Sequence, residues 1–136
     1  MEGLGRLFNA VTSATTAKVR ASLRQARSAT VFCIGATSGD MTLFQYNAAS
    51  GGTETALNVD HYYTQNNGVW TRVDNLPADN GFTAATGGLL AVPVQGTSLA
   101  DGYSHIGASH ATGSMLIVVH DLLNQRDPAL LPDLRA

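Results

Sequence analysis

The pattern of hydrophobic and polar positions is simplest near the C-terminal end, where residues 115–119 (MLIVV) include no polar side chain. A strand with one face in water alternates apolar and polar residues, because successive side chains point to opposite faces. An unbroken apolar run therefore predicts a strand that is covered on both faces. The run has about half the length needed to cross a membrane. We predict a central strand within residues 114–123.

Short apolar segments separated by turn residues predict further strands in the preceding part of the chain. The expected strands lie at 30–34, 41–46, 54–65, 69–73, 89–94 and 103–108. The turn sequence TSGD at 37–40 predicts that the first two form a hairpin. Pro93 cannot donate a hydrogen bond to a neighbouring strand, and so predicts an edge position for its own strand. About seven strands with no helix between them predict a mainly β fold, an antiparallel β-sandwich or flattened barrel, over residues 28–123.

The sequence Asn66-Asn67-Gly68 predicts a tight turn between two paired strands. A three-residue loop would pair Gln65 with Val69 and place the apolar side chains of both strands on one face. A two-residue loop would mix apolar and polar side chains on each face. We predict the three-residue loop, because burial of an apolar face selects the register. Gly68 is expected in the left-handed conformation.

The other face of this hairpin is predicted to carry Tyr62, Trp70 and Arg72 together. A guanidinium beside aromatic rings forms a cation–π stack, which would shield the sheet. Exposed aromatic and Arg side chains are also common at the centre of protein interfaces. A shielding stack and a contact patch for a partner are both consistent with the sequence, so these three are candidate interface residues.

Residues 1–27 predict a basic helical arm. Apolar side chains recur at the spacing of one helix face, at Leu4, Leu7, Phe8 and Val11. A second apolar stripe runs from residue 19 to residue 26, beside the basic side chains of Arg20, Arg24 and Arg27. The Ser and Thr residues between 12 and 16 are weak helix formers and predict a break. We expect the arm to dock on a neighbouring subunit, on an acidic surface or on its own domain, although transit peptides and membrane-surface helices share its composition.

Residues 124–136 predict an extended tail. Pro128 and Pro132 exclude a regular strand or a long helix over this stretch. Leu130 and Leu131 lie between the two prolines, and free apolar tails are seldom left in water. We therefore expect both leucines to dock on a surface.

The charge of the chain is low and unevenly distributed. Charged residues make up 13% of the 136 residues, about half the usual share. Residues 1–27 carry five basic side chains against one carboxylate, a net charge of +4, whereas residues 28–136 carry three against nine, a net charge of −6. So little charge is typical of a surface that neighbours cover, and a weakly charged secreted β domain is the alternative. The single Cys33 excludes an internal disulfide and is expected to be a buried small hydrophobe.

Few residues form a pattern that supports chemistry. His105, His110 and His120 would bind a metal only if their strands converged, and Asp121 would then add a carboxylate. We expect these histidines to face solvent or to be satisfied within the core. Ser104, His105 and Asp121 include the residue types of a hydrolase triad, but no nucleophile-turn motif accompanies them.

Motifs for nucleotides and nucleic acids are also missing from the sequence. The glycine pairs at 51–52 and 87–88 lack the spacing of nucleotide-binding loops. The basic residues are concentrated in the arm and are not interleaved with aromatic residues, which argues against a specific nucleic-acid reader. We expect no enzyme activity, no metal, no cofactor, no specific nucleic acid and no membrane partner.

The tail sequence at 120–132 (HDLLNQRDPALLP), the glycine pair at 51–52 and the segment at 68–73 (GVWTRV) resemble small virion proteins of tailed bacteriophages. The resemblance implies a non-enzymatic head decoration or minor capsid protein, located in the virion. Its implied partners are copies of itself and a major capsid protein, with arms exchanged between neighbours in an oligomer or lattice. Tail-tube, connector and coat proteins share this style of sequence.

Two other classes of function remain open from the sequence. A carbohydrate-binding β-sandwich module would use Tyr62, Trp70 and Tyr103 as platforms for sugar rings. A small hydrolase would depend on Ser104, His105 and Asp121. A glycan array and an esterase screen separate these functions from a role in assembly.

Overall fold

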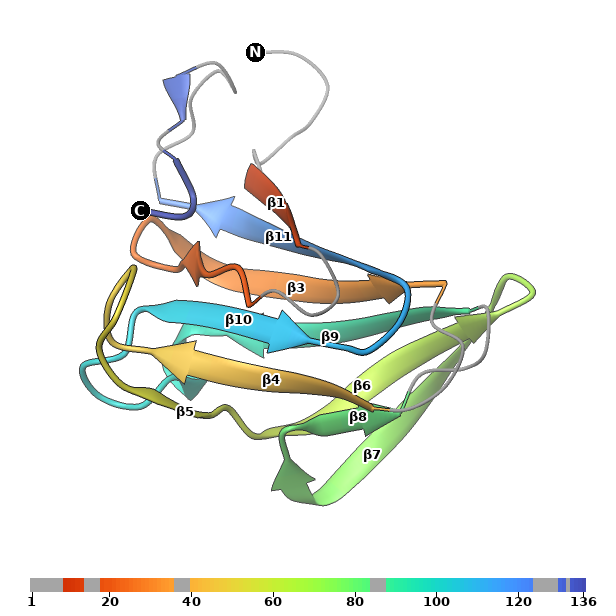
Figure 1. Cartoon of the computed structure of the whole chain (residues 1–136). Coiled ribbons are helices and arrows are strands. Elements are labelled where there is room, and N and C mark those ends of the chain that lie inside the picture. The colour runs from red at the N-terminus through yellow and green to blue at the C-terminus, as the bar shows by residue number, and fades with distance from the viewer. Residues whose placement is uncertain (1–8, 14–17, 36–39, 84–87, 124–129, 132) are drawn as a thin grey trace.

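The computed structural model describes residues 9–13, 18–35, 40–83, 88–123, 130–131 and 133–136. In them the chain is mainly β and forms two antiparallel sheets (Figure 1). The strands are β1 (Asn9–Ser13), β2 (Ala21–Ser22), β3 (Ala26–Ile34), β4 (Asp40–Tyr46), β5 (Glu54–Ala56), β6 (Val59–Asn66), β7 (Val69–Asp79), β8 (Gly81–Thr83), β9 (Leu89–Gln95), β10 (His105–Ser109) and β11 (Ser114–Leu122). A short 3-10 helix, η1 (Gly96–Ser98), follows β9.

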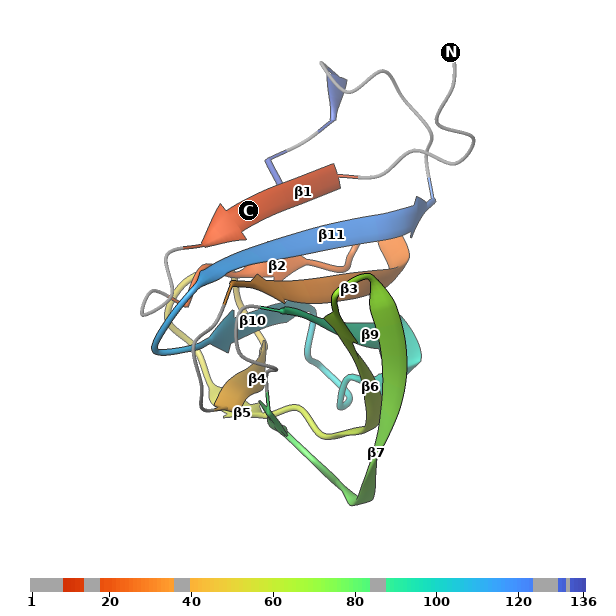
Figure 2. The same ribbon diagram turned by 90° about the vertical axis from the view of Figure 1, so that its right-hand side faces the viewer.

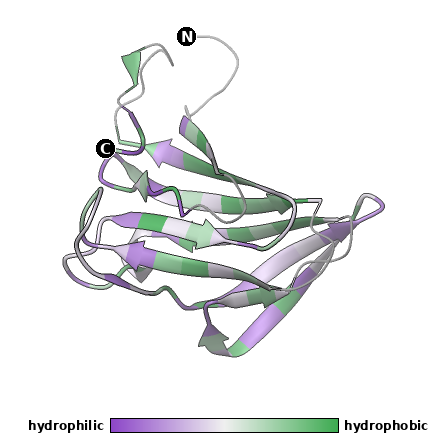
Figure 3. Cartoon of the chain, viewed as in Figure 1, coloured by the Kyte–Doolittle hydropathy of each residue, from purple (hydrophilic) through white to green (hydrophobic). Residues whose placement is uncertain are grey.

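The two sheets face one another across one hydrophobic core, in a sandwich-like arrangement (Figure 2). One sheet has the strand order β1-β11-β3-β9-β6-β7, and the other has the order β2-β10-β4-β5 with β8 beside β4. Met115, Ile117 and Val119 of β11 are each 1% exposed, and Leu43 and Ile106 are buried against them from the other sheet. Figure 3 shows hydrophobic residues recurring along the strands of both sheets.

The strand predicted at 114–123 is central, but only one of its faces is covered. β11 lies between β1 and β3, so its position inside the sheet is confirmed. Leu116 and Val118 alternate with the core residues and are only partly buried, because their face of the sheet points away from the other sheet. Burial on both faces was therefore a wrong prediction. One face of the apolar run packs in the core, and the other face places hydrophobic side chains on the outer side of the sheet.

The hairpin between β6 and β7 has the register that the sequence argument rejected. Asn66 pairs with Val69 and Tyr63 pairs with Arg72, so the turn has two residues, Asn67 and Gly68. Their φ angles are 51° and 78°, and Asn-Gly is the preferred sequence for such a turn. The left-handed Gly68 is confirmed. The register prediction failed because β7 is an edge strand with little burial on either face, so burial could not select the register.

Replacing Gly68 with valine is expected to lower the free energy of unfolding by about 1 kcal/mol or more, because a Cβ disfavours positive φ. A Cβ at this position would meet no atom within 4 Å, so the cost is conformational and not steric. Asn66→Ala in the same turn is the control, with an expected change below about 0.5 kcal/mol. Urea unfolding of both variants measures the difference. Equal losses would contradict the turn conformation.

Two further strand predictions are corrected. Residues 30–34 and 41–46 do not form a hairpin, because β3 belongs to the six-stranded sheet and β4 to the other. The strand that includes Pro93 is not at an edge but lies between β3 and β6. Its pairing with β6 runs from Leu89 to Ala91 and stops before Pro93. A proline fits in this inner strand because its missing N–H falls beyond the end of that ladder.

The predicted helical arm is wrong where the structure describes it. Residues 9–13 pair as β1 with β11, and residues 21–22 pair as β2 with β10. Val11 packs against the core from β1, opposite Ile117 in register. β-branched Val and Thr residues favour a strand, and pairing with the edge of β11 outweighs a helical spacing of apolar residues. Leu4, Leu7 and Phe8 lie outside the described residues.

The C-terminal segment lies against its own domain. Leu131 and Leu134 pack on the core, and the backbone N–H of Ser22 donates to the carbonyl of Leu134 at 2.8 Å. Docking of Leu131 is thus confirmed. Leu130 is 68% exposed, so the same expectation was wrong for it.

Candidate functional site

The outward-facing side of the six-stranded sheet carries an unusual number of apolar side chains. The strand registers place Leu116 beside Phe32, Phe32 beside Ala91, and Ala91 beside Tyr63. Steps of two residues along β3, β9 and β11 add Ile34, Leu89 and Val118, and the register of β6 with β7 adds Trp70 opposite Gln65. We call the following set the apolar outer face: Phe32, Ile34, Leu89, Leu116, Val118 and Trp70.

The apolar outer face is accessible to solvent. Ile34 and Trp70 are each 47% exposed, and the other members are partly buried. An antiparallel sheet with one face in water normally carries polar residues on that face. Hydrophobic side chains on three adjoining strands and on β7 therefore form a patch of the kind that marks an interaction site.

Charged side chains are confined to the margins of this face. At the outward positions of β3, β9 and β11, between residues 28–34, 89–95 and 114–120, the chain has no Lys, Arg, Asp or Glu. On β7 the Nε of Arg72 donates to Asp74 Oδ1 at 2.9 Å. Next to it, Asp60 Oδ1 lies 2.7 Å from His61 Nδ1, and this contact lowers the pKa of Asp60. An apolar centre with a polar rim is the usual anatomy of a protein interface.

The structure divides the predicted group of Tyr62, Trp70 and Arg72. Tyr62 is 6% exposed and packs edge-on against Phe82 in the core, with ring centroids 5.3 Å apart. Trp70 and Arg72 lie on the outer side of the hairpin, where their neighbour is Tyr63. The error follows from the register: a two-residue turn shifts the pairing by one residue and exchanges the two faces. A sugar platform that includes Tyr62 is therefore not assembled.

A polar cluster stands at one end of the apolar outer face. Ser28 Oγ lies 2.9 Å from His120 Nδ1 and donates to Asp121 Oδ2 at 2.8 Å, while Thr30 Oγ1 lies 3.0 Å from His120 Nε2. Asp121 has φ of 56° and interrupts the pairing between β11 and β3. Sequence reasoning missed this cluster because Ser28 and His120 are 92 residues apart and meet only through the strand register.

The polar cluster fixes the orientation of His120 but offers little to a substrate. When Ser28 donates to Asp121, its oxygen is left to accept from Nδ1–H, and Nε2 accepts from the hydroxyl of Thr30. In hydrolase triads the imidazole lies between a hydroxyl and a carboxylate. In this cluster the hydroxyl of Ser28 contacts both His120 and Asp121, and none of these groups lines the cavity described below.

The candidate triad of Ser104, His105 and Asp121 is not assembled. His105 is fully buried, with Ser104 Oγ at 2.7 Å from Nδ1 and the main-chain oxygen of Ala136 at 3.1 Å from Nε2. Asp121 accepts instead from Ser28. His110 is 3% exposed, and its Nδ1 accepts from the backbone N–H of Thr112. The three histidines have separate partners, and the described residues include no group of His, Cys, Asp or Glu arranged for a metal.

Stability is expected to fall as the pH drops through the ordinary pKa of histidine, about 6.5. Burial lowers the pKa of His105, and the positive charges of Arg24 and Arg20 act in the same direction. The unfolded chain then binds the proton more tightly, so the stabilisation is present above the ordinary pKa and is lost below it. Chemical denaturation between pH 5 and pH 8 measures the slope, which for one proton reaches at most about 1.4 kcal/mol per pH unit.

His105→Gln is the control for this pH dependence. The variant keeps a polar side chain at the site but cannot take up a proton, so its stability should fall less steeply with decreasing pH. Equal slopes in the variant and the parent protein would show that His105 is not the responsible group.

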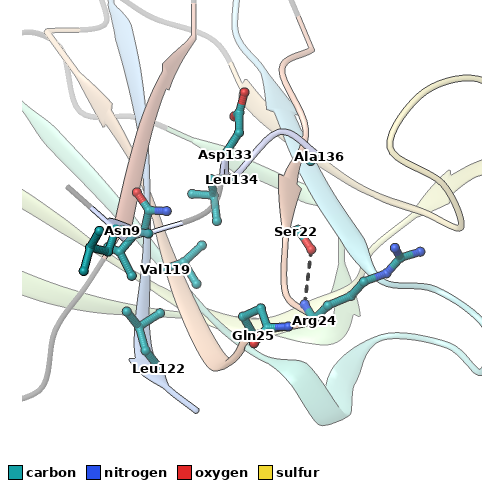
Figure 4. A pocket seen from close by; sticks show the side chains of 11 residues that line it. Asn9, Ser22, Arg24, Gln25, Val119, Leu122, Asp133, Leu134 and Ala136 are labelled. Carbon is teal, nitrogen blue, oxygen red and sulfur yellow. Dashed lines mark hydrogen bonds between the residues drawn. The ribbon is translucent and has the colours of Figure 1, made fainter. Parts of the chain in front are cut away.

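A cavity of about 490 Å³ lies between the β1–β11 edge, β2 and the C-terminal segment (Figure 4). Val119 and Leu122 contribute apolar surface, and Ser22, Arg24 and Gln25 contribute polar groups. The predicted interface residues Leu130 and Leu131 belong to the same lining. The cavity is therefore lined by predicted interface residues from both ends of the chain, namely Arg24, Leu130 and Leu131.

The predicted interface residue Arg20 is engaged within its own chain. Its guanidinium stacks 3.9 Å from the ring centroid of Tyr46 and donates to the carbonyls of Ala48 and Gly51 at 2.7 and 2.8 Å. This contact holds the loop after β4 against the residues before β2. Arg27, in contrast, is exposed on β3.

Comparison with known proteins found no matching family model, no curated relative and no solved structure with a similar fold. No helix among the described residues is long and apolar enough to pass through a bilayer. The residues themselves therefore carry the functional argument.

Proposed function

We propose that this protein acts by assembly, as a non-enzymatic structural subunit of a bacteriophage virion of the decoration or minor capsid type. Its partners in this proposal are copies of itself and a major capsid protein. The observation that carries the proposal is the apolar outer face, which a freely diffusing domain has no reason to keep in contact with water.

The chemistry of the molecule supports assembly over catalysis. The uncharged centre of the outer face, with Arg72, Asp74 and Asp121 at its margins, has the layout of a contact surface. The low share of charged residues, 13% of the chain, agrees with a surface that neighbouring subunits partly cover. The polar cluster at Ser28 and His120, by comparison, does not line the cavity between the β1–β11 edge and the C-terminal segment.

The virion as the place of assembly rests on the resemblance of residues 120–132 and 68–73 to small phage virion proteins. The mode of contact differs from the exchanged helical arms that this resemblance implies. β1 and the described part of the C-terminal segment lie on their own domain. We therefore assign the main contact to the sheet face, and tail-tube, connector or coat positions remain the alternative sites in the particle.

Mass spectrometry of purified particles tests this proposal. Phage particles are banded on a density gradient from cells that carry the encoding genome, and the molar ratio of this chain to the major capsid protein is measured. A fixed ratio is expected in the wild type and a strongly reduced ratio with Ile34→Lys, whereas Val69→Lys, on the opposite side of β7, should retain it. Absence of the chain from washed wild-type particles would refute a structural role.

A further inference from the structure

We infer that the apolar outer face pairs with the same face of a second copy of this chain, in a two-fold symmetric dimer. The inference rests on the proposed function, because it takes this face as an assembly surface, and it names the partner. Three properties of the face point to self-association: its shape, its charge and its area.

The strand register of the face allows large and small side chains to meet when two copies of the face are paired. Phe32 and Ala91 are partners in the register of β3 and β9, so a large side chain stands beside a small one that is only 6% exposed at the centre of the sheet. A two-fold axis that runs parallel to the strands, between β3 and β9, places Phe32 of each copy over Ala91 of the other. The same axis places Ile34 over Leu89, since these two are also register partners. Large side chains then meet small ones, and apolar side chains meet apolar ones.

The charge of the face favours a copy over a charged partner. The outward positions of β3, β9 and β11 carry no charged residue, so nothing there selects a basic or an acidic surface. Arg72 and Asp74 already pair with each other on β7, outside the centre. A neutral apolar surface gains most from a second neutral apolar surface, because no charge loses its water.

The outer side of the whole six-stranded sheet, which includes the apolar outer face and its polar margins, approaches the area that a stable dimer needs. Six strands about 4.8 Å apart, with about seven residues of about 3.3 Å each, cover on the order of 670 Å² in projection. Protruding side chains add to the accessible area, and a standard interface buries about 800 Å² on each partner.

Sedimentation equilibrium of the full chain over a wide concentration range tests the inference. The wild type is expected to shift from a 14.2 kDa species to one of twice that mass as concentration rises. Ile34→Lys should raise the dimer dissociation constant by about 100-fold or more, because a symmetric interface carries the substitution twice. Val69→Lys adds the same charge on the other side of β7 and should leave the constant unchanged. Circular dichroism checks that each variant is folded.

A side-chain exchange provides a second test that does not depend on charge. Phe32→Ala and Ala91→Phe should each weaken the dimer about 10-fold or more, and the double variant should regain most of the loss, because it restores one large and one small side chain. If Ile34→Lys does not fold, this exchange decides the question. A double variant that is weaker than both single variants would contradict the proposed axis.

The outcomes separate the dimer from the function. A wild type that stays monomeric, or a dimer that Ile34→Lys and Val69→Lys weaken equally, overturns the dimer. If the wild-type chain is monomeric and Ile34→Lys still reduces its amount in particles, the dimer is overturned but the proposed function stands. The partner of the face is then a shell protein. If Ile34→Lys weakens the dimer but the wild-type chain is absent from washed particles, the dimer is supported and the proposed function is refuted.

Discussion

Ile117→Asp is expected to abolish cooperative folding of the domain. Ile117 is 1% exposed at the centre of β11, where it faces the opposite sheet. Loss of the aliphatic side chain costs about 2 to 5 kcal/mol, and an unpaired buried carboxylate costs about 3 to 5 kcal/mol more. Together these approach the whole stability of an ordinary domain, about 5 to 15 kcal/mol. Circular dichroism and thermal unfolding measure the effect.

Val118→Asp is the matched control for this variant. It adds the same carboxylate one residue along β11, but on the outward face, where the charge reaches water. We expect a folded protein whose stability falls by about 1 kcal/mol. If Val118→Asp unfolded the domain as completely as Ile117→Asp, both faces of β11 would be buried in the free chain, contrary to the observed exposure.

Phe82→Ala is expected to lower the free energy of unfolding by about 3 to 5 kcal/mol. Phe82 is fully buried although β8 has only three residues, and it pairs in register with Met41 of β4. Its ring also meets Tyr62 edge-on across the core. Removing it leaves a cavity between the two sheets at the place where β8 is attached. Urea unfolding measures the decrease in the free energy of unfolding.

Phe82→Leu keeps most of the buried volume and provides the comparison. Its expected loss is below about 1.5 kcal/mol. A loss of less than about 1 kcal/mol for Phe82→Ala would contradict the account, because it would mean that β8 contributes little to the core.

The strand content of the body could be predicted from the sequence, but the way in which strands combine could not. Apolar runs and turn residues located β3, β4, β9, β10 and β11 to within a few residues. Strand partners depend on the whole topology, so neighbours along the chain at β3 and β4 were paired wrongly. The helical spacing in residues 1–27 was misleading because isolated apolar positions fit more than one period. Pairing with an available strand edge then decided the structure of β1 and β2.

The candidate site was predicted only in part, for a related reason. Trp70 and Arg72 were placed together on an outward face, as observed, but Tyr62 was assigned to the wrong face by a one-residue shift of register. The apolar run at 115–119 was interpreted as burial on both sides. A single sequence cannot tell a strand covered by its own domain from one whose second face awaits another molecule. Phe32, Ile34 and Leu89 were therefore overlooked as contact residues.

Fluorescence of the tryptophan tests the central claim, that the outer face is the assembly surface. Trp70 is the single tryptophan of the chain, and it is 47% exposed on that face. Its emission spectrum and its quenching by acrylamide are compared between the free chain and the assembled particle. Burial of the face predicts a shift of the emission to shorter wavelength and a marked loss of quenching on assembly. Unchanged emission and unchanged quenching in the assembled state would contradict the account.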